Sequence, residues 1–196
     1  MNFERMEKSG RPMDDAYPFV AASGPALQPQ ACAVSPVAME AFAAGNLRME
    51  RQEFADAVAC FEWAIAHEPG VAEFHFNRAN ALAAVKRFDA ALEGYEAAIG
   101  LRPGYAQAHS NRGNALYAMG QYFEAIQSFD LAVLFKPDMG EAHLNRGNAL
   151  IRLKQYVQAF QSYEAAIACN AGLVEAIFNK GIALQIMLNE HKDANG

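Results

Sequence analysis

The sequence predicts an all-α protein built from a repeated pair of helices, and three observations lead to this fold class. The hexapeptide NRGNAL occurs at 111–116 and again at 145–150, and the related sequences NRANAL and NKGIAL occupy 77–82 and 179–184. Successive copies start 34 residues apart, and a fixed period of this length is typical of stacked helical units. Within each period, apolar residues recur at helical rather than alternating spacing.

Rows of small and aromatic residues follow the same period. The small rows are Gly45, Ala79, Gly113, Gly147 and Gly181; Ala57, Ala91, Ala125 and Ala159; and Ala64, Ala98, Ala132 and Ala166. The aromatic rows are Phe54, Phe88, Tyr122 and Tyr156, and Phe61, Tyr95, Phe129 and Tyr163. We expect the small residue at the eighth position of a unit to face the alanine at the twentieth, so that the two helix backbones approach closely. The rings are then expected to fill the space between consecutive pairs.

The first 35 residues fall outside the period and are rich in Pro, Gly, Ala and Ser. We expect them to form a flexible N-terminal tail, with a docking segment as the alternative. Ser35 and Pro36 then have the residue types favoured at a helix N-cap and at the first helical position. A first helix is therefore predicted to begin here.

Four full units follow, at 38–71, 72–105, 106–139 and 140–173, within a repeat domain that covers 36–190. In the fourth unit the pattern predicts helices over 140–153 and 156–169, joined by a turn at Lys154 and Gln155. Asp138 is the expected N-cap of the first of these helices. Pro69, Pro103 and Pro137 close three of the units, because proline cannot continue a helix.

An extra helix is predicted over 174–190, followed by a short C-terminal tail at 191–196. It carries Ile182, Leu184, Ile186, Met187 and Leu188, whereas the terminal unit of a repeat array normally has a polar outer face. We therefore expect this helix to meet a partner or a second copy, or the chain to be part of a longer repeat protein.

The 34-residue period, the two helices per unit and the G…Y…A…F…A…P rows resemble the tetratricopeptide repeat (TPR) family. The resemblance covers most of the chain and implies an α-solenoid: a right-handed superhelix of four full repeats plus one extra helix. The sequence departs from the pattern at Ala79, where glycine is usual, at Ala171, where proline is usual, and in the fifth unit, which has no second helix.

Composition excludes several classes of function. The formal net charge is −6, which argues against general binding to nucleic acid and against docking on an anionic membrane. Neither a run of about 18 apolar residues nor a secretory signal is present. Cys32, Cys60 and Cys169 are widely spaced and odd in number, which fits a reducing cytoplasm. No catalytic or cofactor-binding motif appears, so we expect a protein without enzymatic activity, cofactor or metal.

Two asparagine rows are the strongest candidates for a functional site. One row is Asn77, Asn111, Asn145 and Asn179, at the sixth position, and the other is Asn46, Asn80, Asn114 and Asn148, at the ninth. Both lie on a face of the first helix that the packing rows do not use. The TPR resemblance places this face in the concave groove. A primary amide both donates and accepts hydrogen bonds, so it can hold an extended polypeptide by its backbone. The rows are similar to the asparagine ladder of the TPR superhelix in O-linked N-acetylglucosamine transferases.

Two alternatives explain the asparagines without a ligand: the amides bond to neighbouring helices and orient the stack, or recent duplication copied them. Against copying, positions regarded as exposed have diverged between the third and fourth units while the asparagines have not. The diverged pairs are Ser110 and Leu144, Tyr117 and Ile151, Ala118 and Arg152, and Glu124 and Gln158.

Three further sets accompany the asparagines. Glu73, Glu141, Arg152 and Glu175 are predicted to form the rim of the groove. A basic row, Arg78, Arg112, Arg146 and Lys180, either contacts an acidic partner or pairs with nearby glutamates. His75, His109 and His143 repeat at the fourth position, but stacked helices stand about 8–10 Å apart, too far to share one metal ion. We expect these imidazoles to be mostly buried and hydrogen-bonded.

The sequence thus predicts a non-catalytic, cytoplasmic scaffold that binds an extended protein segment through asparagine amides. Some TPR domains grip a C-terminal carboxylate with lysines at the second and fifth positions of their first helices. Those positions hold no lysine here, so a clamp of that kind is not expected. Two other functions remain open: the substrate-recruiting part of a larger glycosyltransferase-like enzyme, and self-assembly through the 174–190 helix.

Overall fold

The computed structural model describes residues 34–195, with side chains as far as Lys192. Contacts divide the chain into Met1–Ala33 and Val34–Gly196, and the fold below is that of the second unit. The flexible tail predicted for 1–35 lies almost entirely outside the described residues. Of its last two residues, Ser35 donates its backbone N–H to Oε1 of Glu68 at 3.2 Å.

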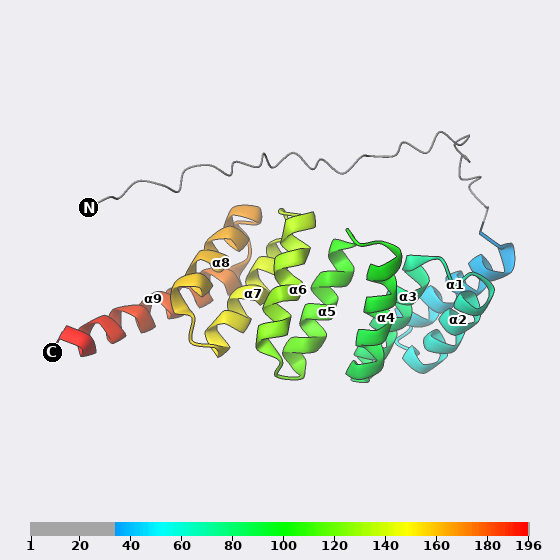
Figure 1. Ribbon diagram of the computed structural model, residues 1–196, viewed down its shortest axis with the longest axis horizontal. Coiled ribbons are helices and arrows are strands. Elements are labelled where there is room, and N and C mark those ends of the chain that lie inside the picture. The colour runs from blue at the N-terminus through cyan, green and yellow to red at the C-terminus, as the bar shows by residue number, and fades with distance from the viewer. Residues whose placement is uncertain (1–33, 196) are drawn as a thin grey trace, which may run out of the picture. The chain divides into compact units, whose positions relative to one another are not determined.

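The described part of the chain consists of helices joined by short turns, as predicted, and Figure 1 shows them following one another along the array. The first helices of the repeats are α1 (Pro36–Glu50), α3 (Ala72–Ala84), α5 (Ala106–Ala118), α7 (Gly140–Arg152) and α9 (Val174–Asn195). The second helices are α2 (Phe54–His67), α4 (Phe88–Leu101), α6 (Tyr122–Phe135) and α8 (Tyr156–Cys169).

One predicted helix end and one predicted capping residue differ from the structure. Helix α9 continues to Asn195, through most of the segment expected to be a C-terminal tail. The prediction that Asp138 caps α7 was wrong: Met139 occupies the N-cap and makes no side-chain capping bond. Asp138 instead belongs to the preceding turn, where its carbonyl oxygen accepts the N–H of Gly140 at 3.1 Å. Ser35 does precede α1 as predicted, although without a side-chain capping bond.

The turn inside each repeat places one residue in the left-handed region. These residues are Gln52, Lys86, Gly120 and Lys154, with φ between 58° and 80°. They share one position of the 34-residue period, so all four repeats use the same tight turn. Only the third repeat has a glycine there, the residue that adopts this conformation without steric cost.

The glycines at the eighth position lie closest to an aromatic ring of the second helix. In the second repeat, the eighth-position Ala79 and the twentieth-position Ala91 belong to one buried cluster, in line with the expected pairing. A methyl group placed on Gly45, Gly113 or Gly147 would approach a ring carbon of Phe61, Phe129 or Tyr163 to 2.5–2.7 Å. The same rings cluster with a buried alanine of the next repeat, such as Ala81 beside Phe61 and Ala149 beside Phe129. Each ring therefore joins its own repeat to the next one, as predicted for the aromatic rows.

Consecutive first helices come closer together than consecutive second helices. Close backbone approaches join α1 to α3, α3 to α5, α5 to α7 and α7 to α9, whereas the backbones of α2, α4, α6 and α8 do not approach one another as closely within the described residues. Neighbouring repeats therefore converge on the side of the array formed by the first helices. The asparagine rows lie on these helices.

Candidate functional site

The two asparagine rows form one hydrogen-bonded ladder across consecutive first helices. Each sixth-position amide donates an N–H to the Oδ1 atom of the ninth-position asparagine in the preceding repeat, over 2.8–3.0 Å. The bonded pairs are Asn77 with Asn46, Asn111 with Asn80, Asn145 with Asn114, and Asn179 with Asn148. The structural alternative raised by the sequence is therefore present: the amides bond to neighbouring helices.

Two of the four ninth-position amides also bond to a buried tyrosine. The hydroxyl of Tyr95 donates to Oδ1 of Asn80 at 2.8 Å, and that of Tyr163 donates to Oδ1 of Asn148 at 2.9 Å. Burial raises the pKa of both phenols above the ordinary range, so they remain neutral donors. In the third repeat the ring is Phe129, and Asn114 receives no hydroxyl. Sequence reasoning missed these bonds, although the tyrosines follow the same period.

The ladder leaves part of each amide available. An amide has two N–H donors and one oxygen that accepts twice. In the pair of Asn114 and Asn145, the described residues supply only the bond between the two side chains, which is exposed, whereas the other three ladder bonds are partly buried. The Oδ1 atom of Asn145 and both N–H groups of Asn114 can therefore bind another molecule.

Pockets open beside the ladder at two equivalent places in the repeat array. One pocket, of about 290 Å³, lies between α7 and α9 and is lined by Asn148, Tyr163 and Asn179 together with Tyr117, Ile151, Arg152, Glu175 and Ile182. The other, of about 370 Å³, lies between α3 and α5 and is lined by Asn80, Tyr95 and Asn111 together with Ala83, Ala84, Phe88, Asn114 and Ala115. Equivalent positions line both, but Ile151 and Arg152 stand where the second pocket has Ala83 and Ala84.

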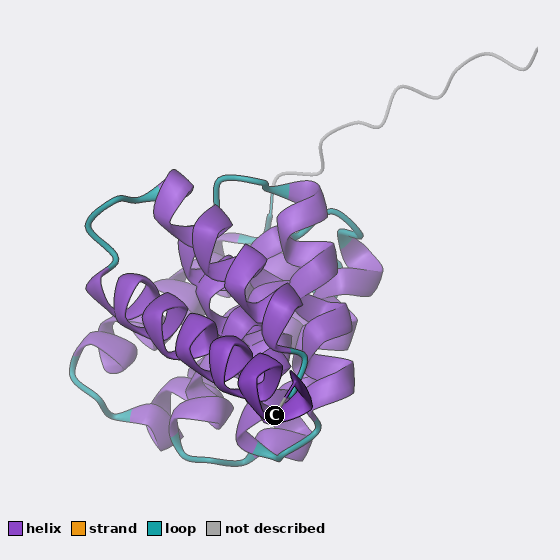
Figure 2. Cartoon of the chain, turned by 90° about the vertical axis from the view of Figure 1, so that its left-hand side faces the viewer, coloured by secondary structure: helices purple, strands orange, loops and turns teal. Residues whose placement is uncertain are grey.

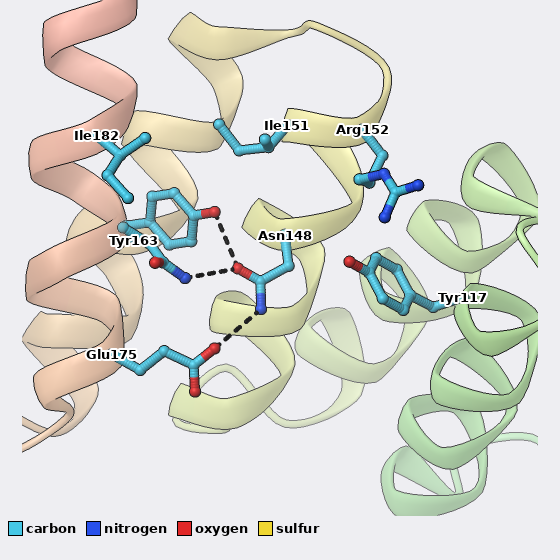
Figure 3. A pocket seen from close by; sticks show the side chains of 8 residues that line it. Tyr117, Asn148, Ile151, Arg152, Tyr163, Glu175 and Ile182 are labelled. Carbon is cyan, nitrogen blue, oxygen red and sulfur yellow. Dashed lines mark hydrogen bonds between the residues drawn. The ribbon is translucent and has the colours of Figure 1, made fainter.

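Figure 3 shows the pocket between α7 and α9 from close by. The Oδ1 atom of Asn148 accepts bonds from Tyr163 and from Asn179, and its Nδ2 atom lies 3.4 Å from Oε1 of Glu175. The guanidinium of Arg152 lies 4.7 Å from the centre of the Tyr122 ring. A positive group and a negative group therefore flank this pocket on opposite sides of Asn148.

The rim residues have different surroundings. Glu73 is bonded to Arg102 of its own repeat. Burial would raise the pKa of Glu73, but the bonds from Arg102 and from the backbone hold it below its usual value. Glu141, Arg152 and Glu175 are exposed. The structure thus leaves an acidic and a basic group accessible at the C-terminal end of the ladder.

The basic row forms ion pairs that link consecutive repeats. Arg78, Arg112, Arg146 and Lys180 pair with Glu62, Glu96, Asp130 and Glu164, the acidic residues of the preceding second helix, over 2.6–3.0 Å. Arg112 and Arg146 also donate to the buried hydroxyls of Ser128 and Ser162 in their own repeats. These charges are matched inside the repeat array, which is the second of the two roles considered for this row.

The histidine row is hydrogen-bonded, as expected. Nε2 of His75, His109 and His143 lies 2.8–3.0 Å from the carbonyl oxygen of Pro69, Pro103 and Pro137. His109 is buried, and the other two are partly buried. Among the described residues, no group of three His, Cys, Asp or Glu side chains is placed to hold a metal ion. No described helix is both long and apolar enough to span a membrane.

Comparison with known families decides the identity of the repeat. The family model described as tetratricopeptide repeat matches residues 42–106, 84–139 and 110–173. The chain belongs to the tetratricopeptide repeat family. No curated protein is significantly similar to it.

Solved TPR structures share the fold at low sequence identity. MamA 41-end from Desulfovibrio magneticus RS-1 is 19% identical with a TM-score of 0.74, over 83% of this chain and 92% of that one. YrrB, a TPR protein with an unusual peptide-binding site, is 19% identical with a TM-score of 0.67, over 78% of each chain. The first TPR of Spaghetti (RPAP3), bound to the HSP90 peptide SRMEEVD, is 24% identical with a TM-score of 0.59, over 60% of this chain and 94% of that one.

Proposed function

We propose that this TPR chain is a non-catalytic scaffold that binds an extended polypeptide along its asparagine ladder. The observation that carries the proposal is the incomplete use of the amides. The rung formed by Asn114 and Asn145 keeps donors and an acceptor that no other described side chain takes up. Peptide groups of an extended chain present the complementary N–H and C=O groups whatever their side chains.

The spacing of the ladder suits an extended chain. Packed helices stand about 8–10 Å apart, and an extended chain advances about 3.3 Å per residue. One rung therefore corresponds to about three residues of ligand, on the side where first helices converge. A segment that reaches from the rung of Asn80 and Asn111 to that of Asn148 and Asn179 would present a new peptide group to each rung.

The two pockets supply a basis for sequence preference. The pocket beside Asn80 is lined by Ala83 and Ala84 and offers no charge to a ligand side chain. The pocket beside Asn148 is flanked by Arg152 and Glu175. We therefore propose that the bound segment places an uncharged side chain in the first pocket and a polar or charged one in the second.

Two structural neighbours support peptides as the ligand class, because one was solved with a peptide and the other is described by its peptide-binding site. The ligand proposed here is not an acidic peptide such as SRMEEVD of the first case. The second positions of the first helices hold Glu73, Gln107, Glu141 and Glu175 rather than lysine, so an acidic segment would meet negative charge.

The test is peptide selection followed by affinity measurement on one ladder rung. Peptides of random sequence would be selected on the full chain, and their dissociation constants measured for wild type and for Asn114→Ala/Asn145→Ala. The double variant removes both side chains of the 2.9 Å bond, so no amide is left without its partner. The fold should therefore keep its melting temperature. We expect the affinity to fall about tenfold or more, as for loss of one or two net hydrogen bonds.

A matched control removes two amides from the second helices. Gln127→Ala/Gln161→Ala deletes exposed side chains at equivalent positions of α6 and α8, away from the ladder, and should leave the affinity unchanged. Selected peptides that bind the ladder variant as tightly as wild type would contradict the proposed site, and failure to select any peptide would contradict the proposed function.

A further inference from the structure

The eighth-position row ends in a glycine that has no packing partner. In three repeats this glycine seats a ring of the second helix, because a methyl group on Gly45, Gly113 or Gly147 would stand only 2.5–2.7 Å from a ring carbon. At Gly181, in α9, a methyl group would meet nothing within 4 Å. The face of α9 around Gly181 therefore corresponds to the face that packs against a second helix in the other repeats. No described residue covers it at Gly181.

Large apolar side chains surround Gly181 on the same face of α9. Val174 is 75% exposed, Phe178 67% and Ile177 50%, and Leu184 and Leu188 are more than two-fifths exposed. The opposite face carries Ala176 and Ala183, which are fully buried toward the rest of the array. In Figure 2, α9 lies in front of the other helices, with this end of the array toward the viewer.

The exposed face is self-complementary about Gly181. Val174 and Leu188 stand seven residues before and after it, and Phe178 and Leu184 stand three residues before and after it. With 3.6 residues per turn, all four lie within about 60° of Gly181 around the helix. A two-fold axis through Gly181 would bring Val174 of one helix onto Leu188 of the other, and Phe178 onto Leu184, with the two glycines at the crossing.

We propose that a second copy of this chain covers the face, with α9 packed antiparallel on α9 and the two-fold axis at Gly181. Such an isologous contact closes as a dimer, because each copy uses the same patch. The central face, from Val174 to Leu188, carries no charged residue within this arc. Because glycine has no side chain, the two helix backbones can approach closely at the crossing, as the Tyr163 ring does at Gly147.

The size of the patch predicts a reversible dimer. Two copies of five partly exposed side chains withdraw on the order of 1,000 Å² from water, at the lower edge of specific interfaces. The ladder stays accessible in this arrangement, because Asn179 bonds to Asn148 from another side of α9. The dimer is thus independent of the proposed peptide site and would present two grooves.

The first experiment is sedimentation equilibrium of the full chain from low- to high-micromolar concentration. Wild type should shift from monomer to dimer, and Phe178→Glu should weaken the association at least tenfold while keeping the helical circular dichroism and the melting temperature of the dilute protein. Phe123→Glu is the matched control: its ring on α6 is 61% exposed, and its dimerisation should equal that of wild type.

The second experiment tests the axis. In a background with Cys32, Cys60 and Cys169 changed to alanine, Gly181→Cys should oxidise to a disulfide dimer, whereas Gly100→Cys, at an open position of α4, should not. A wild type that stays monomeric throughout would overturn the proposal, as would a dimer indifferent to Phe178→Glu. Disulfide formation by both Val174→Cys and Gly181→Cys would indicate a parallel pair, and formation by Val174→Cys alone would place the axis away from Gly181. Either result would overturn the proposed arrangement.

Discussion

At the scale of single residues, Asn148 shows why an asparagine persists inside these helices. Its Oδ1 atom accepts bonds from Asn179 and Tyr163. An asparagine costs a helix about 0.5 kcal/mol relative to alanine, whereas each net hydrogen bond contributes about 1 kcal/mol. The propensity cost of the rows is therefore offset by bonds between repeats, and the rows do not by themselves demonstrate a ligand.

The tyrosine hydroxyls provide a prediction about stability. Tyr163→Phe should lower the free energy of unfolding by about 1 kcal/mol, because it removes the bond to Asn148 and keeps the ring. The converse change, Phe129→Tyr, should raise it by a similar amount, because Asn114 presents the equivalent acceptor. Urea denaturation of both variants measures these effects. Equal stability of Tyr163→Phe and wild type would show that the hydroxyl bond contributes nothing.

The same phenols predict how stability responds to alkaline pH. Burial raises the pKa of Tyr95 and Tyr163 in the folded chain, whereas an unfolded tyrosine ionises near pH 10. The unfolded state thus releases protons first, so the stabilisation is complete below about pH 10 and decreases as the pH rises above it. Denaturation of wild type and Tyr95→Phe/Tyr163→Phe across this range should give a steeper loss for wild type. Parallel pH profiles would refute the assignment.

At the scale of helices, the sequence period predicted most boundaries but only some of the contacts between helices. The limits of α8 and the start of α9 agree with the expectation. The period did not reveal that the Tyr163 ring lies closest to Gly147, because spacing along the chain leaves the offset between two helices undetermined. Side-chain interlock sets that offset. For the same reason Ser110 and Leu144, taken as exposed, are buried.

The site was predictable to a similar extent. Helical periodicity was enough to place both asparagine rows on one face of the first helices. The hydrogen bonds between the two rows depend on the offset between consecutive first helices. The periodicity of a single helix does not reveal this offset. The acidic residues that pair with the basic row, from Glu62 to Glu164, do follow the 34-residue period, so this pairing could have been found by comparing the two rows.

Glycine substitutions test the ring contact directly. Gly147→Ala places a methyl group 2.5 Å from a ring carbon of Tyr163 and should destabilise the fold by about 1–3 kcal/mol through overpacking. Gly100→Ala is the control, since nothing lies within 4 Å of its methyl position, and it should stabilise α4 by up to about 1 kcal/mol. Thermal and urea unfolding should show a lower stability for Gly147→Ala and a higher stability for Gly100→Ala, each relative to wild type. Equal effects would mean that the ring does not restrict position 147.

At the scale of the whole described array, neighbouring repeats are joined by several contacts of the same kind. The ladder links consecutive first helices, and the basic row links each first helix to the preceding second helix. Ring contacts add a third link. A stack with such nearest-neighbour coupling presents its first-helix face as a continuous surface, which is the property that an extended ligand requires.

The proposed function requires that ladder amides hold the ligand by its backbone. The most direct measurement is a double-mutant cycle on a selected peptide, combining N-methylation of each peptide N–H in turn with Asn145→Ala, and measuring dissociation constants. At one position the two changes should be coupled by about 1 kcal/mol, because each removes the same bond to Oδ1 of Asn145. Strictly additive losses at every position of the peptide would contradict backbone recognition by the ladder.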